Sequence, residues 1–112
     1  MEGEVDLWVA VIRSALEHCI DPISFSDTRG YKTKDAKARI MRRYINKQRS
    51  VEFFKGKGNF ALACDAAGFD PDFIAELSQK LMDRVKKGGV KEFRKLRHQI
   101  HFGFGKEEKS GR

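Results

Sequence analysis

The chain has 112 residues, of which 40% are hydrophobic and 35% charged, with a formal net charge of +7. This length suits one domain with a single modest core. No apolar run approaches the roughly 20 residues that a membrane-spanning helix needs, and the acidic start MEGEVD lacks the layout of a secretion signal, so we expect no membrane association and a cytoplasmic protein.

The first predicted element is an amphipathic helix over residues 5–20. Its apolar residues recur at helical spacing, and we expect Leu7 and Val11 on the buried face with Trp8 as an anchor in the core. Proline disfavours helical geometry in the residue before it, so Pro22 ends this helix.

Residues 21–33 form a predicted loop with turn-forming Ser, Asp and Gly residues. We expect Ile23 and Phe25 to pack against the core. Arg29, Tyr31 and Lys32 are candidates for contact with a phosphate, and the alternative is a plain surface loop.

Residues 34–49 predict a helix with an apolar side, which includes Ile40, Tyr44 and Ile45, and a basic side. Arginine predominates on the basic side, and its planar guanidinium group matches phosphate oxygens and guanine edges. The alternative is a solvated basic face. The candidate phosphate-binding residues of this helix are Arg39, Arg42, Arg43, Asn46, Lys47 and Arg49.

A short turn from Ser50 to Phe54, capped by Ser50, and a Gly-rich connector over residues 55–58 are expected next. The following segment reads FALACDAAGFDPDFIAELSQK. Residues 60–67 predict a helix that ends at Gly68, and Asp70 with Pro71 predicts the start of a second helix.

This segment resembles a helix-turn-helix: small residues precede the turn glycine Gly68, and apolar Ile74 and Leu77 follow it. Together with Trp8 and the Arg-rich helix containing Tyr44, it is similar to small, mostly uncharacterised phage and prophage proteins with a core like "VC-LAGLDPD-VR". The resemblance implies DNA binding, with the second helix of the motif in the major groove.

The residues that would face the groove carry no Arg or Lys: they are Asp70, Asp72, Phe73 and Glu76. Carboxylates accept hydrogen bonds from cytosine but repel phosphates. Two alternatives therefore remain for this face, a protein-binding surface and a hairpin that serves only the core.

The C-terminal part begins with Lys86-Lys87-Gly88-Gly89, where we expect the helix to break. Residues 90–100 predict a further helix with a second basic stripe, which either grips a phosphate backbone or is merely solvated: Lys91, Arg94 and Lys95. We expect a single helical domain over residues 1–101 and a flexible, basic, Gly-rich tail over residues 102–112.

Patterns of known catalytic or metal sites are missing from the sequence. No HExxH motif, nucleophile elbow, phosphate-binding loop or cysteine and histidine pairing with zinc spacing is present. We therefore expect no enzyme activity, metal or cofactor.

Charge is distributed in blocks. Residues 31–50 hold eight basic and one acidic side chain and residues 83–112 hold ten basic and four acidic, whereas residues 1–30 and 51–82 are net acidic. Two basic blocks indicate a polyanionic partner.

The sequence thus predicts an all-α fold, a compact bundle of four to five helices containing a helix-turn-helix-like hairpin. The favoured function is nucleic-acid binding, most of all to double-stranded DNA, in a regulator or packaging-type protein of phage or mobile-element origin. The rival function is a protein-interaction module, an adaptor or inhibitor of the transcription machinery that docks through the acidic hairpin. A homodimer is compatible with both of these functions.

Overall fold

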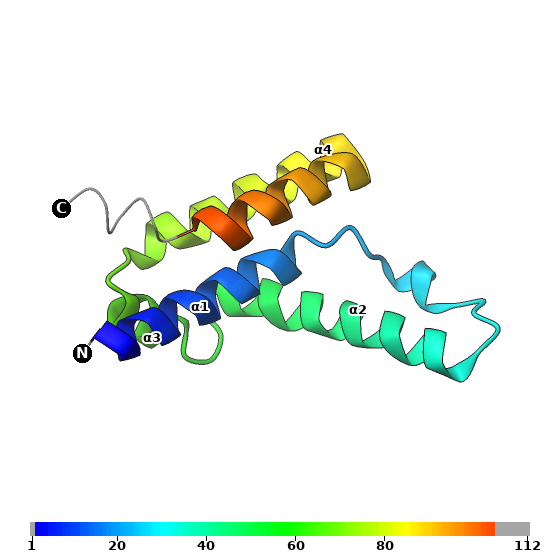
Figure 1. Cartoon of the computed structure of the whole chain (residues 1–112), viewed down its shortest axis with the longest axis horizontal. Coiled ribbons are helices and arrows are strands. Elements are labelled where there is room, and N and C mark those ends of the chain that lie inside the picture. Colours follow the sequence, from blue (N-terminus) through cyan, green and yellow to red (C-terminus); the bar gives the residue numbers. More distant parts are fainter. Residues whose placement is uncertain (1, 105–112) are drawn as a thin grey trace.

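Four α-helices and one short 3-10 helix make up the part of the chain that the computed structural model describes, residues 2–104, with side chains from Val5 onward. This range contains no strand, so the predicted all-α fold is confirmed. In chain order the elements are α1 (Glu2–Cys19), η1 (Phe25–Thr28), α2 (Lys34–Phe54), α3 (Phe60–Ala67) and α4 (Pro71–Gly103), as Figure 1 shows.

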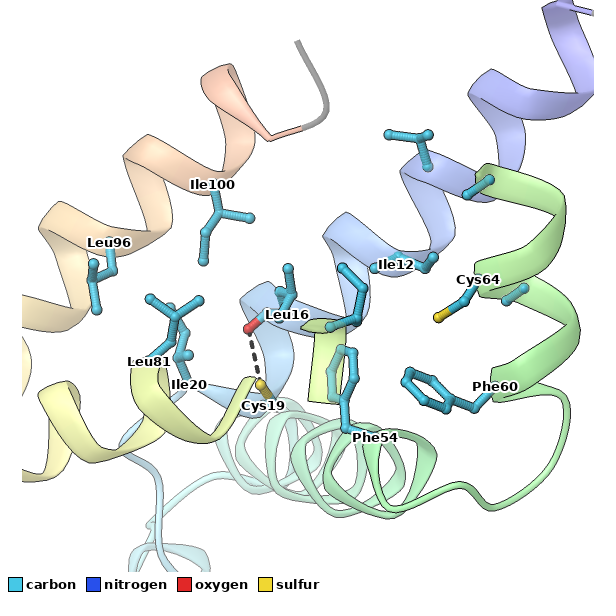
Figure 2. Packing of buried hydrophobic residues seen from close by; sticks show 14 of the residues in the cluster. Ile12, Leu16, Cys19, Ile20, Phe54, Phe60, Cys64, Leu81, Leu96 and Ile100 are labelled. Carbon is cyan, nitrogen blue, oxygen red and sulfur yellow. Dashed lines mark hydrogen bonds between the residues drawn. The ribbon is translucent and has the colours of Figure 1, made fainter. Parts of the chain in front are cut away.

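The other helices pack around α1. It contacts α2, α3 and α4, and its Ile12, Leu16 and Cys19 are fully buried. Figure 2 shows these side chains between two groups of apolar residues. One group comes from α2 and α3 and includes Phe54, Phe60 and Cys64, and the other comes from α4 and includes Leu81, Leu96 and Ile100. A single core therefore joins all four helices.

Two apolar residues of α1 do not join this core, contrary to the sequence-based expectation. Leu7 is 60% exposed and Val11 is also exposed, whereas Trp8 is partly buried and packs against the core. The reason is that the neighbouring helices cover only one side of α1, and Leu7 and Val11 lie on the side that no described helix covers.

The helix α2 continues through Ser50, so the predicted separate turn at residues 50–54 is wrong. Ser50 is buried inside the helix instead of capping one. The helix extends because its last turn has apolar partners: the rings of Phe53, Phe54 and Phe60 pack edge to face, with centroids 5.2–5.8 Å apart.

The long helix α4 is a hairpin of two arms, and Figure 1 shows it doubling back on itself. Gly89 has non-helical dihedral angles, φ 71° and ψ −155°, and separates the arms. Near the turn Arg84 and Glu92 form an ion pair with an N–O distance of 2.7 Å, and at the open end the rings of Phe69 and Phe104 lie 5.4 Å apart. The break predicted at residues 86–89 is confirmed.

The second arm of α4 runs to Gly103, past the domain boundary expected at residue 101. Phe104 follows as the C-cap residue and packs partly against the core, so residues 102–104 belong to the folded domain. The rest of the predicted tail, residues 105–112, lies outside the described residues.

Candidate nucleic-acid interface

The connection between α3 and α4 has the local geometry that its sequence predicts. Gly68 is the C-cap of α3 and has a φ of 81°, a conformation that glycine adopts freely. The carboxylate of Asp70 accepts a hydrogen bond of 3.0 Å from the backbone N–H of Asp72, and Pro71 occupies the first helical position of α4. The predicted caps on both sides of the turn are thus confirmed.

The face predicted to meet a DNA groove or a protein partner is exposed and acidic. Asp70, Asp72 and Glu76 are all exposed, and Phe73 is 53% exposed among them. In the preceding helix α3, Leu62 is likewise an exposed apolar side chain and Asp65 an exposed carboxylate. No Lys or Arg occurs between residues 58 and 79, so every charged side chain that this segment contributes is a carboxylate.

The outer face of α2 presents part of the predicted basic stripe. Arg39, Arg42 and Arg49 are exposed, and Asn46 between them is partly exposed. Ile45 is exposed as well, although the sequence pattern placed it on the apolar side of the helix. Three of the four arginines therefore present to solvent side chains that have no ion-pair partner in the described structure, so that they can reach phosphates.

The remaining members of the stripe, Arg43 and Lys47, donate hydrogen bonds to Asp21, which lies just after the carboxyl-terminal end of α1. The guanidinium group of Arg43 donates two hydrogen bonds to the carboxylate of Asp21, from Nε at 3.0 Å and from an Nη nitrogen at 2.7 Å. The ammonium group of Lys47 donates to the backbone carbonyl of Asp21. Both side chains therefore have a structural partner in this conformation, unlike Arg39 and Arg42.

Asp21 is a buried acidic residue, which explains this arrangement. One of its carboxylate oxygens also accepts a hydrogen bond of 3.0 Å from the backbone N–H of Ile23, so the carboxylate fixes the start of the loop. A buried carboxylate needs a partner because burial removes its hydration. The hydrogen bond to Asp21 in turn raises the pKa of Arg43, which stays protonated.

The second basic surface lies around the turn of α4. Lys91, Arg94 and Lys95, which the sequence predicted as a second stripe, are all exposed on the second arm. Lys86 and Lys87 of the first arm are exposed beside the same turn. We call these five residues the α4 tip. The sequence offered a signal for Lys86 and Lys87, because they directly precede the Gly-Gly pair that breaks the helix.

Two further side chains of the second arm, Arg97 and His101, face α1. Arg97 Nε lies 4.0 Å and His101 Nδ1 3.6 Å from a carboxylate oxygen of Glu17. This contact holds the second arm against α1. Within residues 2–104, no group of three or more His, Cys, Asp or Glu side chains is placed to hold a metal ion, and no helix is long and apolar enough to cross a membrane.

Comparisons with known proteins give no relative for this chain: no protein-family model, curated protein or solved structure matches it. The resemblance to phage and prophage helix-turn-helix proteins therefore stays a prediction from the sequence.

Proposed function

We propose that the protein binds nucleic acid through phosphate contacts made by two basic surfaces, the outer face of α2 and the α4 tip. The observation that carries this proposal is their position in the molecule. The start of α2 and the turn of α4 lie toward one end of the long axis, whereas α3 and the start of α4 lie toward the other end (Figure 1). The cations of these two surfaces thus lie away from the carboxylates that α3 and the start of α4 carry.

This polarity favours one orientation on a polyanion. Phosphates attract the basic end and repel the end that carries Asp72 and Glu76. The protein would therefore approach nucleic acid with α2 and the α4 tip, and the start of α4, the end of the helix-turn-helix-like hairpin's second helix that carries Asp72 and Glu76, would point away. Double-stranded DNA is the first ligand to test, because it carries a dense line of charge, about one per 1.7 Å.

The test is fluorescence-anisotropy titration of a labelled duplex at several salt concentrations. We expect a log–log slope of about −4 or steeper, which corresponds to several neutralised phosphates. The variant R39E/R42E/R49E should bind far more weakly and with a shallower slope, while its circular dichroism spectrum stays that of the parent. No binding at low salt, or a triple variant that binds like the parent, would contradict the proposal.

A second candidate function rests on the acidic face. Phe73 and Leu62 are large apolar side chains exposed among carboxylates, a combination that suits a protein partner with a basic and apolar surface. Affinity capture from a cell lysate with the parent and with D72K/E76K tests this function. A partner that the parent captures and the variant loses would support it, and identical captured sets would count against it.

A further inference from the structure

Two aromatic rings are exposed within a segment of net positive charge, residues 25–42. Phe25 is 53% exposed and Tyr31 is 41% exposed, both in the segment that leads into α2. The sequence predicted that Phe25 would tuck onto the core, which is wrong: its ring lies against α2 with one edge toward Tyr44, at a centroid distance of 5.7 Å and an interplanar angle of 63°. Ile23, by contrast, is buried as expected.

A hydrogen-bonded turn and two side-chain contacts hold Phe25. Phe25 opens η1, and the backbone N–H of Ser24 donates a 2.8 Å hydrogen bond to the carboxylate of Asp27. The hydroxyl of buried Thr28 donates a 2.6 Å hydrogen bond back to the carbonyl of Phe25. The guanidinium carbon of Arg29 lies 5.1 Å from the centre of the ring. A ring already fixed in this way loses little conformational entropy when a ligand stacks on it.

The surroundings of both rings are cationic. Between residues 25 and 42 two acidic side chains, Asp27 and Asp35, stand against six exposed cations, which are Arg29, Lys32, Lys34, Lys37, Arg39 and Arg42. Tyr31 lies three residues before the start of α2, in the segment that joins η1 to that helix. Exposed aromatic rings within a basic surface are typical of proteins that bind unpaired nucleotides, because every base has a face that stacks on a ring.

We propose that Phe25 and Tyr31 form a stacking platform for unpaired bases, with the neighbouring arginines and lysines holding the phosphates of the same strand. The platform rests on the proposed function, since it needs those phosphate contacts. It narrows the ligand to a nucleic acid with unpaired nucleotides, either a single strand or a single-stranded extension beside a duplex. In a continuous duplex the base faces are covered by their neighbours and offer no surface to the rings.

The experiment compares short strands that differ only in their bases. One is a labelled single strand of mixed sequence, and the other has the same backbone with abasic sites, so that both carry the same phosphates. We expect the parent to bind the strand with bases at least about fivefold more tightly, which is the lower end of what one base–aromatic stack contributes. A duplex with a single-stranded extension should likewise bind more tightly than a blunt duplex of equal charge.

The variant F25L/Y31L removes the aromatic faces but keeps apolar side chains, so that the contact between residue 25 and Tyr44 is retained. It should bind both strands equally while the salt dependence stays that of the parent. The matched control is Phe73→Leu, because Phe73 is as exposed as Phe25 but lies among carboxylates. This control should keep the full preference for the strand with bases.

The outcomes separate the platform from the proposed function. A parent that binds both strands with equal affinity, or an F25L/Y31L variant that keeps the preference, would overturn the platform and leave phosphate binding standing. Absence of binding to either strand and to the duplex at low salt would overturn both.

Discussion

At the residue scale, the structure divides the arginines of α2 into two kinds. Arg43 is tied to buried Asp21, whereas Arg39 and Arg42 carry no ion pair in the described structure. All three belong to one sequence pattern, and the pattern does not distinguish their roles. Their different partners imply different consequences of substitution.

We expect Arg43→Gln to lower the free energy of unfolding by about 1 kcal/mol, because the carboxylate of Asp21 loses its charged partner while the half-exposed position of Arg43 lets solvent screen the pair. Arg42→Gln should change stability by less than about 0.5 kcal/mol. In duplex titrations Arg42→Gln should reduce the salt slope by about one, and Arg43→Gln should leave it unchanged. Urea denaturation and anisotropy measure both effects. A stable Arg43→Gln variant with a reduced slope would show that Arg43 leaves Asp21 to bind phosphate.

At the scale of elements, the α4 hairpin depends on two adjacent glycines. Gly89 lies in a region of φ and ψ that residues with a side chain rarely adopt. At Gly88 an added Cβ would stand 2.6 Å from the Cβ of Glu92, a residue already held by Arg84. The turn therefore brings lysines of both arms to one tip only because neither glycine has a side chain.

Gly89→Ala should lower the free energy of unfolding by about 1–3 kcal/mol, the usual cost of a residue held in a sparsely populated backbone conformation. The matched control is Gly103→Ala in the same hairpin, where a Cβ meets no atom within 4 Å. Because Gly103 lies within the helix, this substitution should be neutral or stabilising by up to about 1 kcal/mol. Thermal and urea unfolding of the two variants give the comparison. Equal stability of Gly89→Ala and the parent would mean that the hairpin turns in another way.

At the scale of the whole molecule, charge is separated along a body whose longest dimension is 50 Å. The helix α3 and the start of α4, which carry Asp65, Asp72 and Glu76, lie toward the end opposite to the turn of α4. The Debye length is about 10 Å at 0.1 M salt and about 30 Å at 0.01 M. Phosphates bound at the basic end should therefore be screened from these carboxylates at moderate salt and not at low salt.

The variant D65N/D72N/E76Q neutralises these three carboxylates and leaves the capping residue Asp70 intact. It tests the orientation of the protein on the duplex. We expect unchanged duplex affinity at about 0.1 M salt and tighter binding at about 0.01 M, for the screening reason given above. If the acidic helix entered the groove instead, removal of its charges would strengthen binding at both concentrations. The measurement is the ratio of dissociation constants of variant and parent at each salt concentration.

The sequence by itself predicted those features that depend on neighbours along the chain. Hydrophobic periodicity marked the helices, Gly68 and Asp70 marked the turn between α3 and α4, and Gly88-Gly89 marked the hairpin, because caps and backbone conformations are local properties. The two basic blocks were equally evident, because the charged residues of a segment can be counted from the sequence without knowledge of the fold.

Tertiary structure decided which side of each helix is covered, and with it the role of individual side chains. Leu7 and Phe25 are apolar yet exposed, and Arg43 belongs to the basic stripe yet holds Asp21, a residue 22 positions earlier in the chain. No local pattern encodes such pairings, because they depend on where distant elements pack. The exposed rings beside the basic stripe were therefore apparent only once η1 lay on α2, and the opposite charges of the two ends only once α4 lay along the body.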